Sequence, residues 1–320
     1  GKILYMVTPL INKPELFDLA AGKSVIEGMH REGYRVYLID HGDPGWDETE
    51  LGLDFYGKTL HDHYLEILKK RHPRAEILIM AYCMGGTLMM PYLARRAEER
   101  LADGKPMDVK KVALMASPIK FDDGDSGHHA IRTLIRQHYD PRLMKELFGA
   151  VNIPPQVIES GMNEIQPGVQ YQVVMGFYGR AENPEAIADA APFLYWLTHG
   201  TRFPVSAHIQ WIQKVFIGNQ IYEGNFRLPS RHPALDGRPV NMDMLRKTGV
   251  AIFEYKGSRD VIAPAGSCVA AETWGQTGPA SASKGGLRNR SIEKNVGHIF
   301  VGSRRHLAEY LAAVNEFYGS

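Results

Sequence analysis

The chain has 320 residues, of which 44% are hydrophobic and 23% charged, and its formal net charge at pH 7 is +1. This composition is typical of a globular protein with an ample core, and the near-neutral charge does not favour nucleic acid as a partner. Two cysteines are too few for a disulfide framework, and no apolar run approaches the ~20 residues that span a bilayer, so we expect a cytoplasmic protein without a transmembrane segment.

The hydrophobic pattern alternates between strand-like and helix-like segments, which is typical of an α/β sheet with crossover helices. The expected strands cover Ile3–Val7, Val36–Asp40, Ile77–Ala81, Val112–Ala116, Val250–Tyr255 and Leu287–Ile292. The expected helices cover Lys23–Glu32, Leu53–Lys70, Met84–Arg100, Pro264–Thr273 and Arg304–Tyr318. Because the strands are almost continuously apolar, we expect a mostly parallel, doubly wound sheet with helices on both faces.

This rhythm breaks between Ile119 and Arg246, in a stretch rich in Met, aromatic residues, Pro and Gly. The stretch is too long for a loop, so we predict an inserted, mostly helical cap. Such a cap would lie over the ends of the strands, where open α/β sheets place their active sites. The predicted division is a core formed by 1–118 and 247–320, and a cap (lid) formed by 119–246.

The segment AYCMGGTL (81–88) lies between an expected strand and an expected helix. This layout is typical of a nucleophile elbow, whose sharp turn requires small residues two positions before and two positions after the nucleophile. Ala81 and Gly85 satisfy that requirement around Cys83. The thiol would lie near a helix N-terminus, where the helix dipole favours a thiolate. The alternative is a buried structural cysteine, but the elbow pattern favours a nucleophile.

Two further residues complete a candidate triad in the chain order nucleophile, acid, histidine. Asp260 lies in a turn after the strand at Val250–Tyr255, and His298 follows the last expected strand. An Asp in a turn or a His in a loop indicates little alone. Together, and each at the carboxyl end of a strand, they predict an α/β-hydrolase fold with a Cys–His–Asp triad.

In such a triad the thiol attacks a carbonyl, the imidazole transfers protons, and the carboxylate orients the ring. The backbone N–H of Met84 is predicted to form half of the oxyanion hole. The other half is expected from the loop after the first strand, at Ile11 or Leu10.

These segments resemble the polyhydroxyalkanoate synthases, a family of the α/β-hydrolase superfamily with a Cys nucleophile. AYCMGGTL is similar to the lipase-like box of the family, and SRDVIAP (258–264) and VGHIF (296–300) resemble its segments with the catalytic Asp and His. The likeness spans most of the chain and is weakest around 120–205. Ala81 replaces the first Gly of the box, and His41 stands where the family usually has Trp.

The resemblance implies an acyltransferase that polymerises (R)-3-hydroxyacyl-CoA through a thioester on Cys83 and releases coenzyme A. A cysteine suits this reaction, because exchange of one thioester for another is nearly balanced and leaves the acyl group activated. The resemblance also implies an acyl-CoA substrate, a polyester product, and an accessory synthase subunit or a homodimer as candidate assemblies. It places the protein in the cytoplasm or at a polyester granule. No metal and no bound cofactor are expected.

Two alternatives stay open. The same triad could serve a hydrolase, namely a thioesterase, an esterase or an intracellular polyester depolymerase. A non-catalytic, granule-bound or regulatory relative is the other alternative, against which the intact triad argues. Only access of water separates a synthase from a hydrolase, so we expect a synthase to shield Cys83 from solvent.

Overall fold

The computed structural model describes residues 1–277 and 287–320, and its centre is a six-stranded sheet in the order β4-β1-β5-β6-β7-β8. All neighbouring strands in this sheet are parallel. The strands are β1 (Lys2–Val7), β4 (Arg35–Leu38), β5 (Glu76–Tyr82), β6 (Val109–Met115), β7 (Ala251–Gly257) and β8 (Arg290–Lys294). The expected strands are therefore confirmed, with ends that differ by a few residues.

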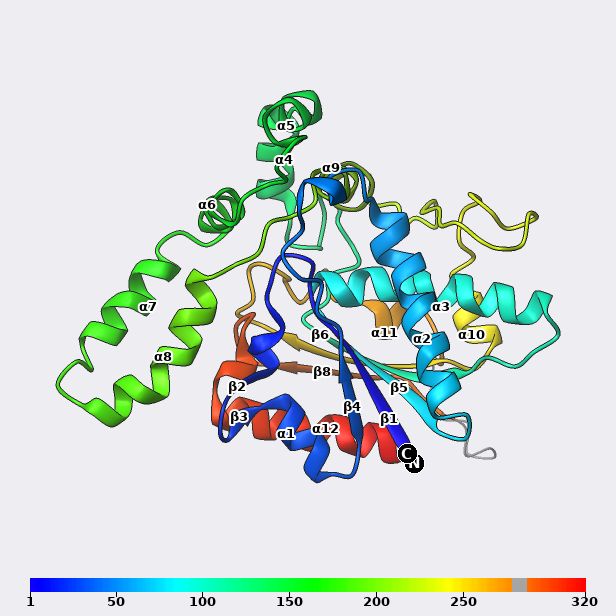
Figure 1. The fold of residues 1–320 in the computed structure, drawn as a ribbon, viewed down its shortest axis with the longest axis horizontal. Coiled ribbons are helices and arrows are strands. Elements are labelled where there is room, and N and C mark those ends of the chain that lie inside the picture. Colours follow the sequence, from blue (N-terminus) through cyan, green and yellow to red (C-terminus); the bar gives the residue numbers. More distant parts are fainter. Residues whose placement is uncertain (278–286) are drawn as a thin grey trace.

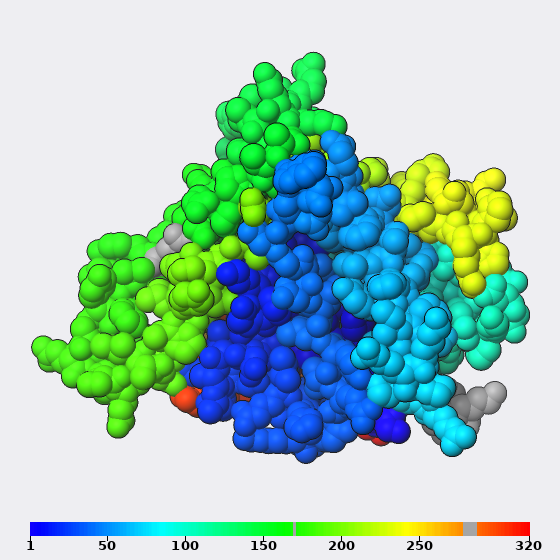
Figure 2. Space-filling model, viewed as in Figure 1, coloured from blue at the N-terminus to red at the C-terminus, as the bar shows by residue number. Residues whose placement is uncertain are grey.

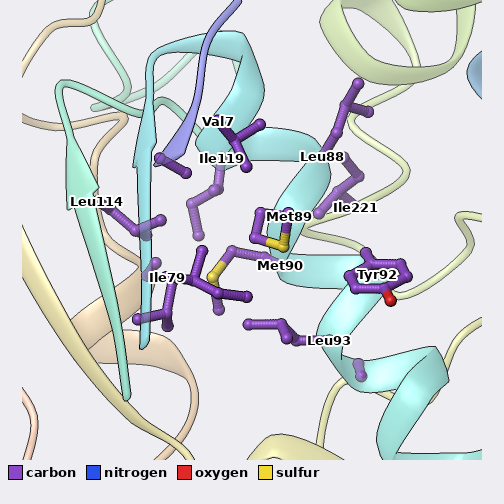
Figure 3. Close-up of a cluster of buried hydrophobic side chains, with 14 of the residues drawn as sticks. Val7, Ile79, Leu88, Met89, Met90, Tyr92, Leu93, Leu114, Ile119 and Ile221 are labelled. Carbon is purple, nitrogen blue, oxygen red and sulfur yellow. The ribbon is translucent and has the colours of Figure 1, made fainter. Parts of the chain in front are cut away.

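Helices cover both faces of the sheet, as the apolar strands predict (Figure 1). They are α1 (Val25–Arg31), α2 (Leu60–Arg71), α3 (Met84–Ala102), α11 (Ala270–Thr273) and α12 (Arg304–Gly319). On β5, Leu78 and Met80 pack with α1 and α12, whereas Ile77 and Ile79 pack with α2 and α3. This alternation buries both faces of every central strand. Figure 3 shows part of the α3 side, where strands and helix meet through Val7, Ile79, Leu114, Met89, Met90 and Leu93.

Two local elements differ from the sequence-based expectation. The expected helix from Pro264 to Thr273 is helical only over α11, because the preceding residues form turns. There the N–H of Ser267 donates to the carbonyl oxygen of Pro264 at 2.8 Å, and the buried Lys256 ammonium donates to that of Cys268 at 2.8 Å. An unexpected antiparallel pair, β2 (Asp18–Ala20) with β3 (Lys23–Ser24), precedes α1.

Residues 119–246 contain most of the remaining helices, and those before about residue 217 rise beyond the strand ends. These are α4 (His129–His138), α5 (Pro141–Phe148), α6 (Pro155–Ile165), α7 (Val169–Tyr178), α8 (Pro184–Thr198), α9 (Val205–Gln210) and α10 (Met244–Lys247). The pairs α4–α5 and α7–α8 project from the body of the molecule (Figures 1 and 2). Within residues 1–277 and 287–320, none of the helices combines the length and apolar character needed to cross a membrane.

The last part of this stretch has a different position. Residues 219–243 run along α3, where the buried Arg95 guanidinium donates to the carbonyl oxygens of Leu228 at 3.3 Å and Arg238 at 2.5 Å. The helices next to the strand ends thus come from residues before about 217. The boundary between core and cap at residue 246 stays a prediction.

Glu254 on β7 is a carboxyl group enclosed in the core, and it gives a prediction about stability. Its Oε2 accepts a hydrogen bond from the Ala271 N–H at 3.0 Å, and its Oε1 has no partner among the described residues. Burial raises the pKa of Glu254 from 4.5 to about 8. Between these two pH values Glu254 is protonated in the folded protein and ionised in the unfolded chain. The free energy of unfolding therefore falls as the pH rises through this range.

We expect Glu254→Gln to remove this loss of stability. Relative to the wild type, the unfolding free energy of the variant should rise by on the order of 3 kcal/mol between about pH 5 and about pH 8. Urea unfolding at several pH values measures this difference. If the unfolding free energies of the wild type and the variant differ by the same amount at every pH, Glu254 is not a buried neutral carboxyl.

Candidate active site

Cys83 occupies a strained turn between β5 and α3. Its φ is 50° and its ψ is −126°, a left-handed conformation that non-glycine residues rarely adopt. Neighbouring backbone holds it there: the Cys83 N–H donates to the carbonyl oxygen of Met115 at 2.8 Å, and the Gly86 N–H donates to that of Cys83 at 3.0 Å. This is the local geometry of a nucleophile elbow.

The two glycines after Cys83 stand where no side chain fits. A Cβ atom at Gly85 would lie 2.7 Å from the carbonyl oxygen of Thr8, and one at Gly86 would lie 2.0 Å from the Ser117 Oγ. Gly85 thus lets α3 approach the loop that follows β1. The small residues of the sequence motif therefore have a steric cause.

We expect Gly85→Ala to lower the free energy of unfolding by about 2–3 kcal/mol, because a backbone oxygen cannot rotate away from the added methyl group. Gly161→Ala on α6 is a matched control, since an added Cβ there meets no heavy atom within 4 Å. The control should be neutral or slightly stabilising. Thermal unfolding compares the two, and equal midpoints would contradict the close approach.

The structure brings Cys83, His298 and Asp260 together. The Nδ1 of His298 lies 2.7 Å from the Asp260 Oδ2. The other carboxylate oxygen accepts the backbone N–H groups of Ile262 at 2.9 Å and Ala263 at 2.8 Å. These bonds fix the orientation of a carboxylate whose side chain is fully buried.

The charge on His298 is set by competing effects. Burial disfavours the charged ring, but the Asp260 carboxylate and the neighbouring Cys83 outweigh it and raise the pKa of His298 to about 10. Because Nδ1 faces Asp260, Nε2 is the ring nitrogen left for Cys83. The other cysteine contrasts with this one: Cys268 is buried, and burial raises the pKa of its thiol well above the usual value.

Tyr82 supports His298, and the sequence reasoning did not identify it. Its hydroxyl donates to the carbonyl oxygen of His298 at 3.0 Å, and the two rings lie 5.2 Å apart between centroids. The sequence contains an indication of this role, because Tyr82 directly precedes Cys83 at the end of the strand. Successive strand residues point to opposite faces of the sheet.

The predicted oxyanion positions differ in their surroundings. Met84 is the first residue of α3, so its N–H lies in the helix turn where amides lack intrahelical partners. Ile11 lines cavities beside Cys83, whereas Leu10 is buried in the core. Both halves of the oxyanion hole stay predictions, and Ile11 is the better placed of the two loop residues.

His41 packs beneath the loop that follows β1. Its Nε2 lies 3.3 Å from the carbonyl oxygen of Thr8, and its ring meets Tyr56 edge-on. Burial lowers the pKa of His41 to about 4, so the ring is neutral near pH 7 and Nε2–H can donate. The histidine at this position therefore supports the loop that approaches Gly85.

Two cavities reach Cys83, which is half-buried. The first has a volume of about 320 Å³ and includes His298 in its wall. The second has a volume of about 390 Å³ and is lined largely by α4, α5, α6 and the segment after α9. The expectation that Cys83 is shielded from solvent is therefore not met.

Comparisons with known proteins indicate the same fold. A family model described as alpha/beta hydrolase fold matches residues 17–141. A poly(3-hydroxyalkanoate) polymerase subunit PhaC of Haloferax mediterranei is 27% identical over 262 residues, which are 82% of this chain and 49% of that protein. The PhaC subunit of Haloarcula marismortui is 27% identical over 247 residues, 77% of this chain and 49% of that protein.

The chain is thus similar to poly(3-hydroxyalkanoate) polymerase subunits, and its fold is that of the α/β hydrolases. It spans about half the length of the curated relatives it matches. Among solved structures, the enol-lactonase from Burkholderia xenovorans has a TM-score of 0.51 at 11% identity, covering 100% of this chain and 92% of that one. MenH from S. aureus has a TM-score of 0.51 at 15% identity, covering 99% and 92%. At these identities the two structures show the fold alone.

Proposed function

We propose that this chain is an acyltransferase of the polyhydroxyalkanoate synthase type, which polymerises (R)-3-hydroxyacyl-CoA and releases coenzyme A. The observation that carries the proposal is the contact of Cys83 with a histidine that Asp260 holds at 2.7 Å. The similarity to polymerase subunits over 82% of the chain supports the choice of substrate. The proposal requires no bound cofactor, and coenzyme A enters as part of the substrate.

The first half-reaction transfers the acyl group to the enzyme. The sulfur of Cys83 attacks the thioester carbonyl, a new C–S bond forms, and the C–S bond to coenzyme A breaks. His298, charged near pH 7 because of its raised pKa, gives its proton to the departing thiolate. Asp260 keeps the ring oriented throughout. One thioester replaces another, so little free energy is lost.

The second half-reaction forms the ester. The neutral imidazole of His298 takes the proton of a 3-hydroxyl group on another hydroxyacyl unit, and that oxygen attacks the Cys83 thioester. A C–O bond forms, the C–S bond breaks, and the thiolate of Cys83 returns beside a charged imidazole. The ester is more stable than the thioester that it replaces, which drives elongation forward.

A hydrolase is the second candidate, and one observation favours it. Cys83 is half-buried, and both cavities are partly open, so water can approach the thioester. In that reaction water would replace the hydroxyl group in the second step.

Product analysis separates the synthase from the hydrolase: the purified chain is incubated with (R)-3-hydroxyacyl-CoA, and free thiol and products are measured. Coenzyme A with insoluble polyester supports the synthase, whereas coenzyme A with an equal amount of free 3-hydroxy acid supports the hydrolase.

Assembly and location belong to the same proposal. We propose a homodimer or a complex with an accessory synthase subunit, in the cytoplasm or at the surface of a polyester granule. The oligomeric state with and without acyl-CoA, measured by light scattering, tests self-association. A monomer with full polymerising activity would exclude the need for either partner.

A further inference from the structure

The two cavities that reach Cys83 have a common neck and different walls. Cys83 and four apolar residues line both of them: Ile11, Ile158, Met162 and Ile262. Beyond this neck the first cavity continues between α6 and α8, and the second continues between α4, α6 and the segment after α9. A group bonded to the Cys83 sulfur therefore has two directions in which it can extend.

The position of His298 makes the two directions chemically different. His298 lines the first cavity and is absent from the described wall of the second. A general acid–base must contact the leaving thiolate and the incoming hydroxyl group. Both of these groups must therefore occupy the first cavity, and the acyl chain on Cys83 must extend elsewhere.

The walls agree with this division. The first cavity has several polar side chains: Asn12, Glu159, Asn163, Gln166 and Thr201. Amide side chains suit the amide groups of the pantetheine arm of coenzyme A. Aliphatic and aromatic side chains make up most of both walls, and polar side chains are fewer in the second.

The titratable groups of the second cavity are either exposed or paired with each other. His138 and Glu164 are exposed. Farther in, the hydroxyl group of Tyr139 lies 3.0 Å from the Nδ1 of His208. Burial lowers the pKa of His208 to about 4, so this pair is neutral near pH 7. A hydrocarbon chain entering this cavity would displace water from apolar walls without separating a charge from its partner.

We propose that the second cavity is the acyl-chain subsite of this protein and that it accepts hydroxyacyl chains longer than four carbons. The inference rests on the proposed function for the identity of the thioester. At roughly 30 Å³ per non-hydrogen atom, a cavity of about 390 Å³ holds on the order of a dozen such atoms. A four-carbon hydroxyacyl group fills about half of that space.

The test uses alkyl methanethiosulfonates, which transfer an alkylthio group to a thiolate, form an S–S bond and release methanesulfinate. Labelling of Cys83 by the methyl, butyl and octyl reagents is followed by mass spectrometry, with rates divided by those for free cysteine. Burial of each methylene is worth about fourfold in an equilibrium constant. We therefore expect the octyl reagent to label the wild type at least about tenfold faster than the methyl reagent.

Matched variants show which cavity holds the alkyl chain of the reagent. Ile135→Trp narrows only the second cavity, and Leu197→Trp narrows only the first; both positions are half-buried. The preference for the octyl reagent should be lost in Ile135→Trp and kept in Leu197→Trp. Gly161→Leu also narrows the second cavity and begins from an open position, so it keeps the test valid if Ile135→Trp does not fold.

Three outcomes would overturn the proposal: no preference for the octyl reagent in the wild type, loss of this preference in Leu197→Trp alone, or loss of this preference in both folded variants. Acylation by four-carbon and eight-carbon (R)-3-hydroxyacyl-CoA is then measured in a single turnover, and Ile135→Trp should slow the longer substrate selectively. If no acyl-CoA acylates Cys83, the proposed function fails. The alkyl labelling would still report on the cavity, so the two failures are distinguishable.

Discussion

Replacing Cys83 with alanine is expected to lower the release of coenzyme A from acyl-CoA by on the order of 10⁴-fold or more. The sulfur is the only atom of the proposed triad that bonds to substrate, and the remaining cysteine cannot substitute for it. Cys268 is buried, its Sγ lies 3.6 Å from the carbonyl oxygen of Ala263, and burial raises its pKa well above the usual value. A thiol reagent should therefore label the native wild type and not the native Cys83→Ala variant.

Cys268→Ala is the matched control for this prediction. It removes the other cysteine of the chain at a site that lines neither cavity among the described residues. Its rate of coenzyme A release should stay within about threefold of the wild type, and its melting temperature should fall because packing around the buried thiol is lost. Substantial turnover by Cys83→Ala would exclude a covalent mechanism on this residue.

Replacing His298 with glutamine is expected to cost about 10³–10⁴-fold in the same assay, because both proposed half-reactions move a proton through the imidazole. In the wild type the ring beside the sulfur is charged near pH 7, since the pKa of His298 is raised to about 10. The variant therefore lacks the proton that the departing thiolate would take in the first half-reaction.

Asp260→Asn separates orientation from proton transfer. The backbone N–H groups of Ile262 and Ala263 would hold the amide oxygen of the new side chain, which turns its NH₂ toward the Nδ1 of His298. That nitrogen must then accept a hydrogen bond, so the remaining ring proton lies on the side of Cys83. We therefore expect a large loss of rate in the same assay.

Each variant also needs a folding control, which thermal unfolding supplies. If both variants fold and release coenzyme A at the wild-type rate, neither residue takes part in the reaction, and the proposed triad would be excluded.

The sheet could be predicted because its strands are buried on both faces, which leaves a continuous apolar run in the sequence. The elbow was equally predictable, since the steric conflict at Gly85 admits only the smallest residue. Asp260 and His298 followed from chain order and from their places after strands. In each case a local pattern reports a constraint that the neighbouring backbone imposes.

Other features depend on contacts between distant segments. The residues from Pro264 look helical, yet they form turns, and the Lys256 ammonium donates to the carbonyl oxygen of Cys268 there. Tyr82 supports His298 across 216 positions of sequence. The cavity walls gather from several helices whose mutual packing no periodicity predicts, and the partial exposure of Cys83 follows from that packing.

The proposed reacting groups and the cavity walls come from different parts of the chain. Cys83, Asp260 and His298 lie outside residues 119–246, whereas most of the second cavity is built inside that stretch. Substitutions within this stretch can therefore alter which substrates bind without altering the bonds that are made and broken. Related proteins could therefore differ in substrate specificity while catalysing the same reaction. Exchange of residues 119–217 between two relatives would then exchange their substrate specificities.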